Sequence, residues 1–191
     1  MKKLNSKGFT LIELLAVVTI MGILMLVAIP AISRTIENTR KDTFLDTAKQ
    51  YVNGLKTMWI SDSLECQETV GGTNYVLASA LSDGDYYVYI DSSKTSGIGA
   101  GTNYPILLQE GGKSSWGKKE VKGYIKISVS GAGTVSAKQQ YYIALGDGTH
   151  GIKDDNITTE YSQLKRGQVE LSGVTAAEVT APSGIKLCKE V

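Results

Sequence analysis

The chain has 191 residues with 20 basic and 19 acidic side chains, so its formal net charge at neutral pH is +1. This balance gives no sign of the basic surface that nucleic-acid-binding proteins carry. One histidine and two cysteines cannot form a His/Cys-rich metal site. Apolar residues make up 42% of the chain, which is enough for a packed core and argues against wholesale disorder.

The N-terminus joins a short basic segment to a long apolar one. Residues 1–8 contain three lysines and no acid, and residues 9–32 contain a single charged side chain, Glu13. As a helix, with about 1.5 Å rise per residue, the apolar segment would span roughly 36 Å, more than the ~30 Å hydrocarbon core of a bilayer. Because the lysines precede the span, we expect the extreme N-terminus to stay in the cytoplasm and the rest to cross the membrane.

Two common N-terminal segments fail to explain Glu13. A cleaved secretory signal has a shorter apolar stretch without an acid inside it. An uncleaved single-span anchor fits the length better, but a carboxylate near the bilayer centre costs roughly 2.5–3.5 kcal/mol and less near an interface. The position of Glu13 therefore predicts a functional role and a partner for its charge.

The sequence of residues 7–15, KGFTLIELL, resembles the class III signal of type IV prepilins. Four features carry the resemblance: a short basic leader, Gly8 before an aromatic residue, Glu13 as the fifth residue after Gly8, and an apolar span that follows directly. Gly22 and Pro30 also stand where many pilins have a helix-weakening Gly and Pro. The resemblance implies a type IV pilin, and more narrowly a major pilin of Gram-positive bacteria.

The resemblance implies a processing reaction and an assembly contact. A membrane prepilin peptidase would cut between Gly8 and Phe9, and Gly8 has no side chain to obstruct the peptidase cleft. The new amine of Phe9 would then be N-methylated. Glu13 of one subunit would face the Phe9 ammonium of a neighbour, which neutralises two charges in a low-dielectric filament core and sets axial register. Gly22 and Pro30 belong to the same assembly segment.

The resemblance also implies what the protein does and where. We expect a structural subunit, not an enzyme, without a cofactor, that leaves a single-pass state in the cytoplasmic membrane and joins an extracellular pilus. The expected partners are copies of the chain, the prepilin peptidase, an assembly ATPase and a platform protein, with no specific nucleic acid. Adhesion, twitching motility, biofilm formation and DNA uptake stay open as roles of the filament.

Two alternatives remain at this point. One is a pseudopilin of a type II secretion or competence system, which would share the N-terminal motif. The other, from a different class, is a single-span anchored surface protein whose head binds a ligand. An N-terminal methyl-phenylalanine on the mature chain would favour the pilin or the pseudopilin over the anchor.

Helical periodicity continues beyond the span. Apolar residues recur at steps of mostly three or four, at Ile32, Ile36, Phe44, Ala48, Val52, Leu55 and Trp59. This spacing predicts one helix over about residues 9–60, with its first part, residues 9–32, in the membrane or filament core and a kink possible at Pro30. The later apolar residues form a stripe that needs a partner surface.

Residues 61–191 predict a β-rich head, so the fold class is α+β. The clearest strands are residues 86–90 and a hairpin of residues 123–129 and 134–145. Weaker signals predict strands at residues 168–171 and 185–187 and a short helix at residues 75–81. An antiparallel sheet with one apolar face would cover the helix, which is also the ladle-like layout of pilins. With residues 1–8 as a leader, we expect three parts in the chain: the leader, the helix of residues 9–60 and the head of residues 61–191.

Few other side chains suggest a site. Cys66 and Cys188 both fall outside the membrane in the predicted topology, where a disulfide persists, and two free buried thiols are the alternative. We expect no resident metal. The calcium candidate considered is a loop containing Asp147, Asp154 and Asp155, which lacks the EF-hand spacing and gains support only from the calcium loop of major pseudopilins. His150, in the same loop, is expected to be a surface residue.

Overall fold

The computed structural model describes residues 9–92 and 113–191, so Gly8 and the rest of the predicted leader lie outside the described residues. One long helix, α1 (Leu11–Ile60), precedes all the strands. The strands are β1 (Leu64–Gln67), β2 (Tyr75–Leu77), β3 (Gly84–Asp91), β4 (Lys122–Ser130), β5 (Lys138–Gly146), β6 (Gly151–Ile152) and β7 (Lys186–Glu190). Short 3₁₀ helices are η1 (Ala78–Ala80), η2 (Asp154–Asn156), η3 (Tyr161–Gln163), η4 (Arg166–Gln168) and η5 (Ala176–Val179). The fold is α+β, as predicted.

Contacts divide the chain into two compact units, Met1–Thr39 and Arg40–Val191, called here the N-terminal unit and the sheet unit. Helix α1 contributes residues to both of them. The helix ends where Asp62 takes a left-handed conformation, with φ of 52°. The N–H of Ser63 then donates to the carbonyl of Met58 at 2.9 Å, which satisfies one of the last helical carbonyls.

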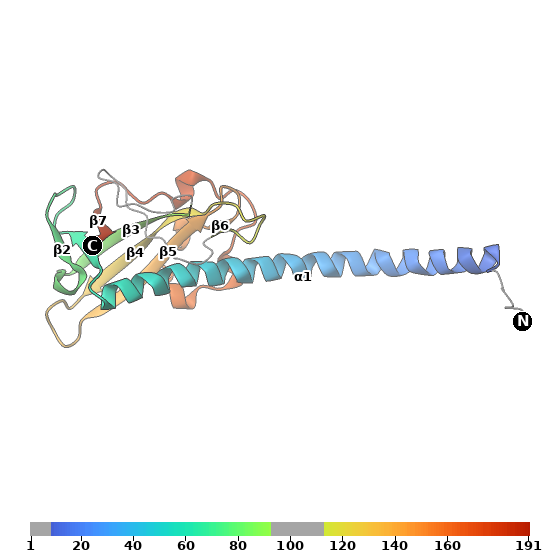
Figure 1. Cartoon of the computed structure of the whole chain (residues 1–191), viewed down its shortest axis with the longest axis horizontal. Coiled ribbons are helices and arrows are strands. Elements are labelled where there is room, and N and C mark those ends of the chain that lie inside the picture. Colours follow the sequence, from blue (N-terminus) through green and yellow to red (C-terminus); the bar gives the residue numbers. More distant parts are fainter. Residues whose placement is uncertain (1–8, 93–112) are drawn as a thin grey trace, which may run out of the picture. The chain divides into compact units, whose positions relative to one another are not determined.

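The strands form one seven-stranded sheet in the order β2-β1-β7-β3-β4-β5-β6 within the described residues. Figure 1 shows β3, β4 and β5 as neighbouring arrows. Neighbours are antiparallel except β3 and β7, which pair parallel, with Tyr86 opposite Lys186 and Tyr87 opposite Leu187. The expectation of a purely antiparallel sheet is therefore wrong at this pair. The reason is topological, because β7 returns from a distant segment and enters between β1 and β3 instead of extending an edge.

One face of the sheet packs on the C-terminal part of α1. The helix buries Phe44, Leu45, Ala48, Tyr51, Val52 and Leu55, which recur at three- and four-residue steps along one face. They share one core with alternate residues of the sheet, such as Val88, Ile125 and Ile127. A smaller cluster around Tyr124, Ala144 and Val174 lies apart from that core and includes residues of η5.

The predicted elements and the observed ones differ in several places. Residues 168–171 are not a strand; Glu170 forms only an isolated bridge with Gly151. Of the short helix predicted at residues 75–81, Ala78–Ala80 are helical, as η1, whereas Tyr75–Leu77 form β2. Strands β1 and β6 were not predicted at all. Ile32 and Ile36 of the predicted stripe are exposed, so the packed part of the stripe begins at Phe44.

Candidate functional site

The first part of α1 carries apolar side chains that nothing in the structure covers. Leu11, Ile12, Leu24 and Leu26 are each more than 60% exposed, and no residue between Leu11 and Ile36 is buried. Among the described residues, α1 is the one helix that is long and apolar enough to cross a membrane by length and composition, and none of the residues in its most apolar stretch is buried. This surface requires an apolar environment outside the chain's own core.

The N-terminus of α1 is closed by a reciprocal pair of hydrogen bonds between Thr10 and Glu13. The backbone N–H of Thr10 donates to Glu13 Oε2 at 2.8 Å, and the Thr10 hydroxyl donates to the same oxygen at 2.7 Å. The N–H of Glu13 donates to the Thr10 hydroxyl oxygen at 3.4 Å. This is a capping box, in which two otherwise unpaired helix-terminal N–H groups find partners.

The capping box adds a role for Glu13 that the sequence interpretation missed. The pattern Thr-x-x-Glu directly before an apolar run is itself a capping signal, so this role was readable from residues 10–13. Both hydrogen bonds from Thr10 use Oε2, and Glu13 Oε1 accepts no hydrogen bond from the residues that the structure describes. The carboxylate is thus held in place at the start of the helix with one oxygen still able to accept.

Gly22 and Pro30 lie within an uninterrupted α1. A Cβ at Gly22 would meet no atom within 4 Å, so packing within this chain does not require glycine there. Pro30 lacks an N–H, which leaves the carbonyl of Leu26 without its usual helical donor. Neither residue is brought near Glu13, since all three follow one another along α1, and Phe9 precedes the helix.

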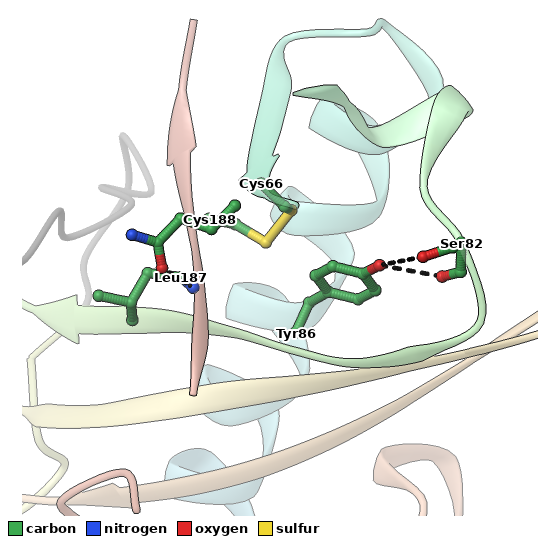
Figure 2. Close-up of a disulfide and its surroundings, with 6 residues drawn as sticks. Cys66, Ser82, Tyr86, Leu187 and Cys188 are labelled. Carbon is green, nitrogen blue, oxygen red and sulfur yellow. Dashed lines mark hydrogen bonds between the residues drawn. A yellow bond between two sulfur atoms is a disulfide. The ribbon is translucent and has the colours of Figure 1, made fainter. Parts of the chain in front are cut away.

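Cys66 and Cys188 form a disulfide between the adjacent strands β1 and β7 (Figure 2). The two residues are direct cross-strand partners, and both are buried. Figure 2 also shows Tyr86 below the bridge, where its hydroxyl donates to the Ser82 carbonyl at 3.0 Å. The bridge therefore fixes β7 to β1 inside the core of the sheet unit.

The weak calcium candidate of Asp147, Asp154 and Asp155 does not form a cluster in the described residues. Within residues 9–92 and 113–191, no group of three or more His, Cys, Asp or Glu side chains could hold a metal ion. The Asp147 carboxylate is instead fully buried and accepts from the N–H groups of His150 at 2.7 Å and Thr149 at 3.0 Å, and from the Ser114 hydroxyl at 2.5 Å. Burial alone would raise the pKa of Asp147, but these hydrogen bonds outweigh it and hold the pKa below its ordinary value.

His150 is mostly covered, which corrects the expectation of a surface residue. Its Nδ1 lies 3.1 Å from Asp147 Oδ2, and its ring stacks on Trp116 with 4.4 Å between centroids. Trp116 in turn contacts Phe44 of α1 with 5.7 Å between ring centroids. No local pattern could have revealed this contact, because Trp116 and His150 are far apart in sequence. The cluster anchors a loop to the helix through the contact between Trp116 and Phe44.

Comparison with known proteins points to the same N-terminal segment. Residues 3–29 match the family model described as the prokaryotic N-terminal methylation motif. The chain is 34% identical to the type IV major fimbrial protein FimA of Dichelobacter nodosus over 115 residues. This aligned segment covers 59% of this chain and 70% of that protein. No solved structure gives a significant match.

The similarity to the fimbrial protein extends well beyond the methylation motif and covers more than two thirds of that relative. The structure is consistent with this similarity, because it has a long N-terminal helix whose first part is apolar and exposed and whose second part packs on a sheet. The chain therefore belongs to the type IV pilins and is a structural subunit of a pilus.

Proposed function

We propose that this chain is a major pilin, made as a membrane precursor and matured by cleavage after Gly8. The proposal divides the chain into a leader of residues 1–8, a helix of residues 9–60 and a head of residues 61–191. Cleavage would leave Phe9 at the N-terminus, where its amine would be methylated. The match of residues 3–29 to the methylation motif supports this reaction.

The observation that carries the proposal is the held carboxylate of Glu13 at the start of an uncovered apolar helix. Removing the leader takes away three lysines, which leaves 20 − 3 = 17 basic against 19 acidic side chains and creates a new α-amine at Phe9. In a filament, the Phe9 amine of one copy would donate to Glu13 of another. Either charge alone in a low-dielectric core would be strongly unfavourable.

The ion pair matters because burial of apolar side chains alone gives little free-energy preference for the filament over the membrane. Lipid tails are as apolar as neighbouring helices, so the exposed side chains of residues 11–36 gain little from leaving lipid for other copies. The charged groups differ, since lipid offers Glu13 no partner and a neighbouring copy does. The pair would therefore select the filament and fix the axial register of its subunits.

We also propose a location and partners for the chain. The precursor would cross the cytoplasmic membrane once, with the leader inside, and then enter an extracellular pilus. Its partners would be other copies, a prepilin peptidase, an assembly ATPase and a platform protein. It would be a structural protein, not an enzyme, and the Gram-positive source expected from the sequence stays a prediction.

Two substitutions test the proposal in the native host. Gly8→Ser should block processing, so that mass spectrometry of the membrane fraction finds the chain with its leader intact. Glu13→Ala should leave processing and Phe9 methylation in place but abolish filaments in sheared surface fractions. Glu37→Ala is the matched control, because Glu37 is an exposed acid of the same helix beyond the apolar span, and it should assemble normally.

Each of these experiments can contradict a separate part of the proposed function. Mature wild-type chain that retains its first eight residues would overturn the cleavage step. Normal filaments from Glu13→Ala would overturn the assigned role of the carboxylate. Loss of filaments in Glu37→Ala to the same degree would show that any change in helix charge blocks assembly.

A further inference from the structure

An open pocket of about 430 Å³ lies in the sheet unit, beside the disulfide-linked strands. Its lining consists of Gln67, Val70, Gly71, Tyr75, Tyr89, Pro182, Ser183, Gly184, Ile185 and Leu187. The volume falls within the range of small-molecule sites, roughly 300–1,000 Å³. We infer that this pocket binds a small neutral carbohydrate, a function separate from polymerisation.

The lining argues for an uncharged ligand. None of the described residues that form it has a formally charged side chain. The ammonium of Lys189 lies 4.3 Å from the centre of the ring of Tyr75, one of the lining residues. Its charge is already matched, because Lys189 Nζ lies 2.7 Å from Glu65 Oε1. A charged ligand would enter this site without a counter-charge.

The lining also combines apolar rings with free polar groups. Tyr75 and Tyr89 are each half-buried, and neither hydroxyl is hydrogen-bonded to another residue in the described part of the chain. Ser183 adds an exposed hydroxyl at the rim. A sugar presents C–H groups on its ring faces and hydroxyls at its edges. Tyrosine suits such a ligand, because its ring is apolar and its tip is polar.

The walls of the pocket are fixed before any ligand binds. Gln67 spans two of them: its Oε1 accepts from the N–H of Leu187 at 2.9 Å, and its Nε2 donates to the Gly72 carbonyl at 2.8 Å. Both Gln67 and Leu187 adjoin the cysteines of the buried disulfide. A pre-formed site loses less conformational entropy on binding than a mobile one.

Two turns that contain glycine border the pocket. Gly71 and Gly184 both have φ near +70°, at 67° and 73°, which other residues rarely adopt. An added Cβ at either position would meet no atom within 4 Å, so the glycines serve the turns and not a close contact. The rim is therefore shaped by backbone geometry, and side chains from two distant segments face the same space.

Saturation-transfer NMR on the full chain in detergent micelles tests the inference. The probes are D-glucose, D-galactose, N-acetyl-D-glucosamine and lactose, with D-glucuronate as the charged member, each up to about 10 mM. At least one neutral sugar should bind saturably with a Kd near ~1 mM, the weak end of specific binding. Tyr89→Ala should weaken it by about 10-fold or more, and Ser183→Trp should block it by filling the pocket from an exposed position.

Two controls separate this site from other effects. Tyr142→Ala removes a half-buried tyrosine of β5 that does not line the pocket, and it should bind the sugar as the wild type does. Glu13→Ala should also bind normally, so failure of assembly and failure of the pocket give different results. No saturable binding of any neutral sugar, binding unchanged in Ser183→Trp, or glucuronate binding as tightly as glucose would each overturn the inference.

Discussion

The two parts of helix α1 differ in what their apolar side chains contact. Residues 11–36 expose almost all of them, whereas Phe44, Ala48, Val52 and Leu55 are completely buried against the sheet. The helix is continuous through both parts, so backbone geometry does not explain the difference. What separates the parts is whether the chain itself supplies a covering surface.

This difference separates assembly from stability. The uncovered part can only be satisfied by lipid or by other molecules, so changes there should affect membrane insertion and assembly. The covered part belongs to the core of the sheet unit, so changes there should affect the free energy of unfolding. Both tryptophans, Trp59 and Trp116, lie in the sheet unit, and their fluorescence therefore reports on that unit alone.

The largest effect on stability should come from removing the disulfide. The two cysteines are 122 residues apart, and closing a loop of that size contributes about 4–5 kcal/mol in the chain-entropy model. Cys66→Ser with Cys188→Ser should lower the free energy of unfolding of the sheet unit by roughly that amount in urea titrations. Far-ultraviolet circular dichroism should show that the N-terminal part of α1 stays helical in micelles. Two free thiols in the purified wild type would contradict this prediction directly.

A pair of leucine substitutions compares the two parts of α1 with the same chemical change. Leu55→Ala removes a completely buried side chain and should lower the free energy of unfolding by about 2–5 kcal/mol. Leu24→Ala removes an exposed one and should change it by less than about 0.5 kcal/mol. Equal losses of unfolding free energy in the two variants, measured by tryptophan fluorescence in urea, would contradict the difference between the two parts of α1.

Asp147 should make a smaller, pH-dependent contribution. Asp147→Ala leaves two backbone N–H groups and the Ser114 hydroxyl without their acceptor, which should cost about 1–3 kcal/mol at neutral pH. Because the pKa of Asp147 is lowered in the folded state, its contribution is complete above the ordinary value of 3.8 and is lost as pH falls below it. The wild type should therefore lose its advantage over the variant in acid.

The exposed Asp155 provides the control for this loop. Asp155→Ala should keep the stability and the acid sensitivity of the wild type. If Asp147→Ala lost stability equally at every pH, the contribution of the carboxylate would come from packing and not from its charge.

The smallest effect should come from the ion pair between Arg166 and Asp42. Arg166 Nε donates to Asp42 Oδ1 at 2.7 Å, Nη2 also contacts Asp42 Oδ2, and both side chains are about half exposed. The hydrogen bond from Arg166 lowers the pKa of Asp42. Arg166→Ala should therefore cost less than any change above, and the loss should shrink as salt is added. A loss as large as that of Leu55→Ala would mean that charge, not burial, holds this part of the helix.

The parts of the fold that local periodicity specifies were predictable. The helical stripe from Phe44 to Leu55 follows a three-to-four-residue step, and strands β3 and β4 alternate buried and less buried residues. Strand β1 is only four residues long and lacks such alternation, and the parallel pairing of β7 depends on contacts between distant segments. Neither can be read from a local window of sequence.

The candidate site divides in the same way. The N-terminal motif and the capping signal of Thr10 and Glu13 are local patterns and are visible in the sequence. The environments of Asp147 and His150 depend on Ser114 and Trp116, which lie more than thirty residues earlier. The pocket is likewise assembled from residues 67–89 and 182–187. Side chains that meet only through tertiary structure left no signal in the sequence.

The central place of β7 has a consequence for how the protein is made. Strands β1 and β2 lie on one side of β7, and β3 to β6 lie on the other, so among the described residues the two groups are joined in the sheet through residues 186–190 alone. During synthesis and export, those groups must wait for residues 186–190 to reach the same compartment before one sheet can close. Until then each group has an open edge that can pair with another chain. Pairing of β7 with both β1 and β3 closes these two edges.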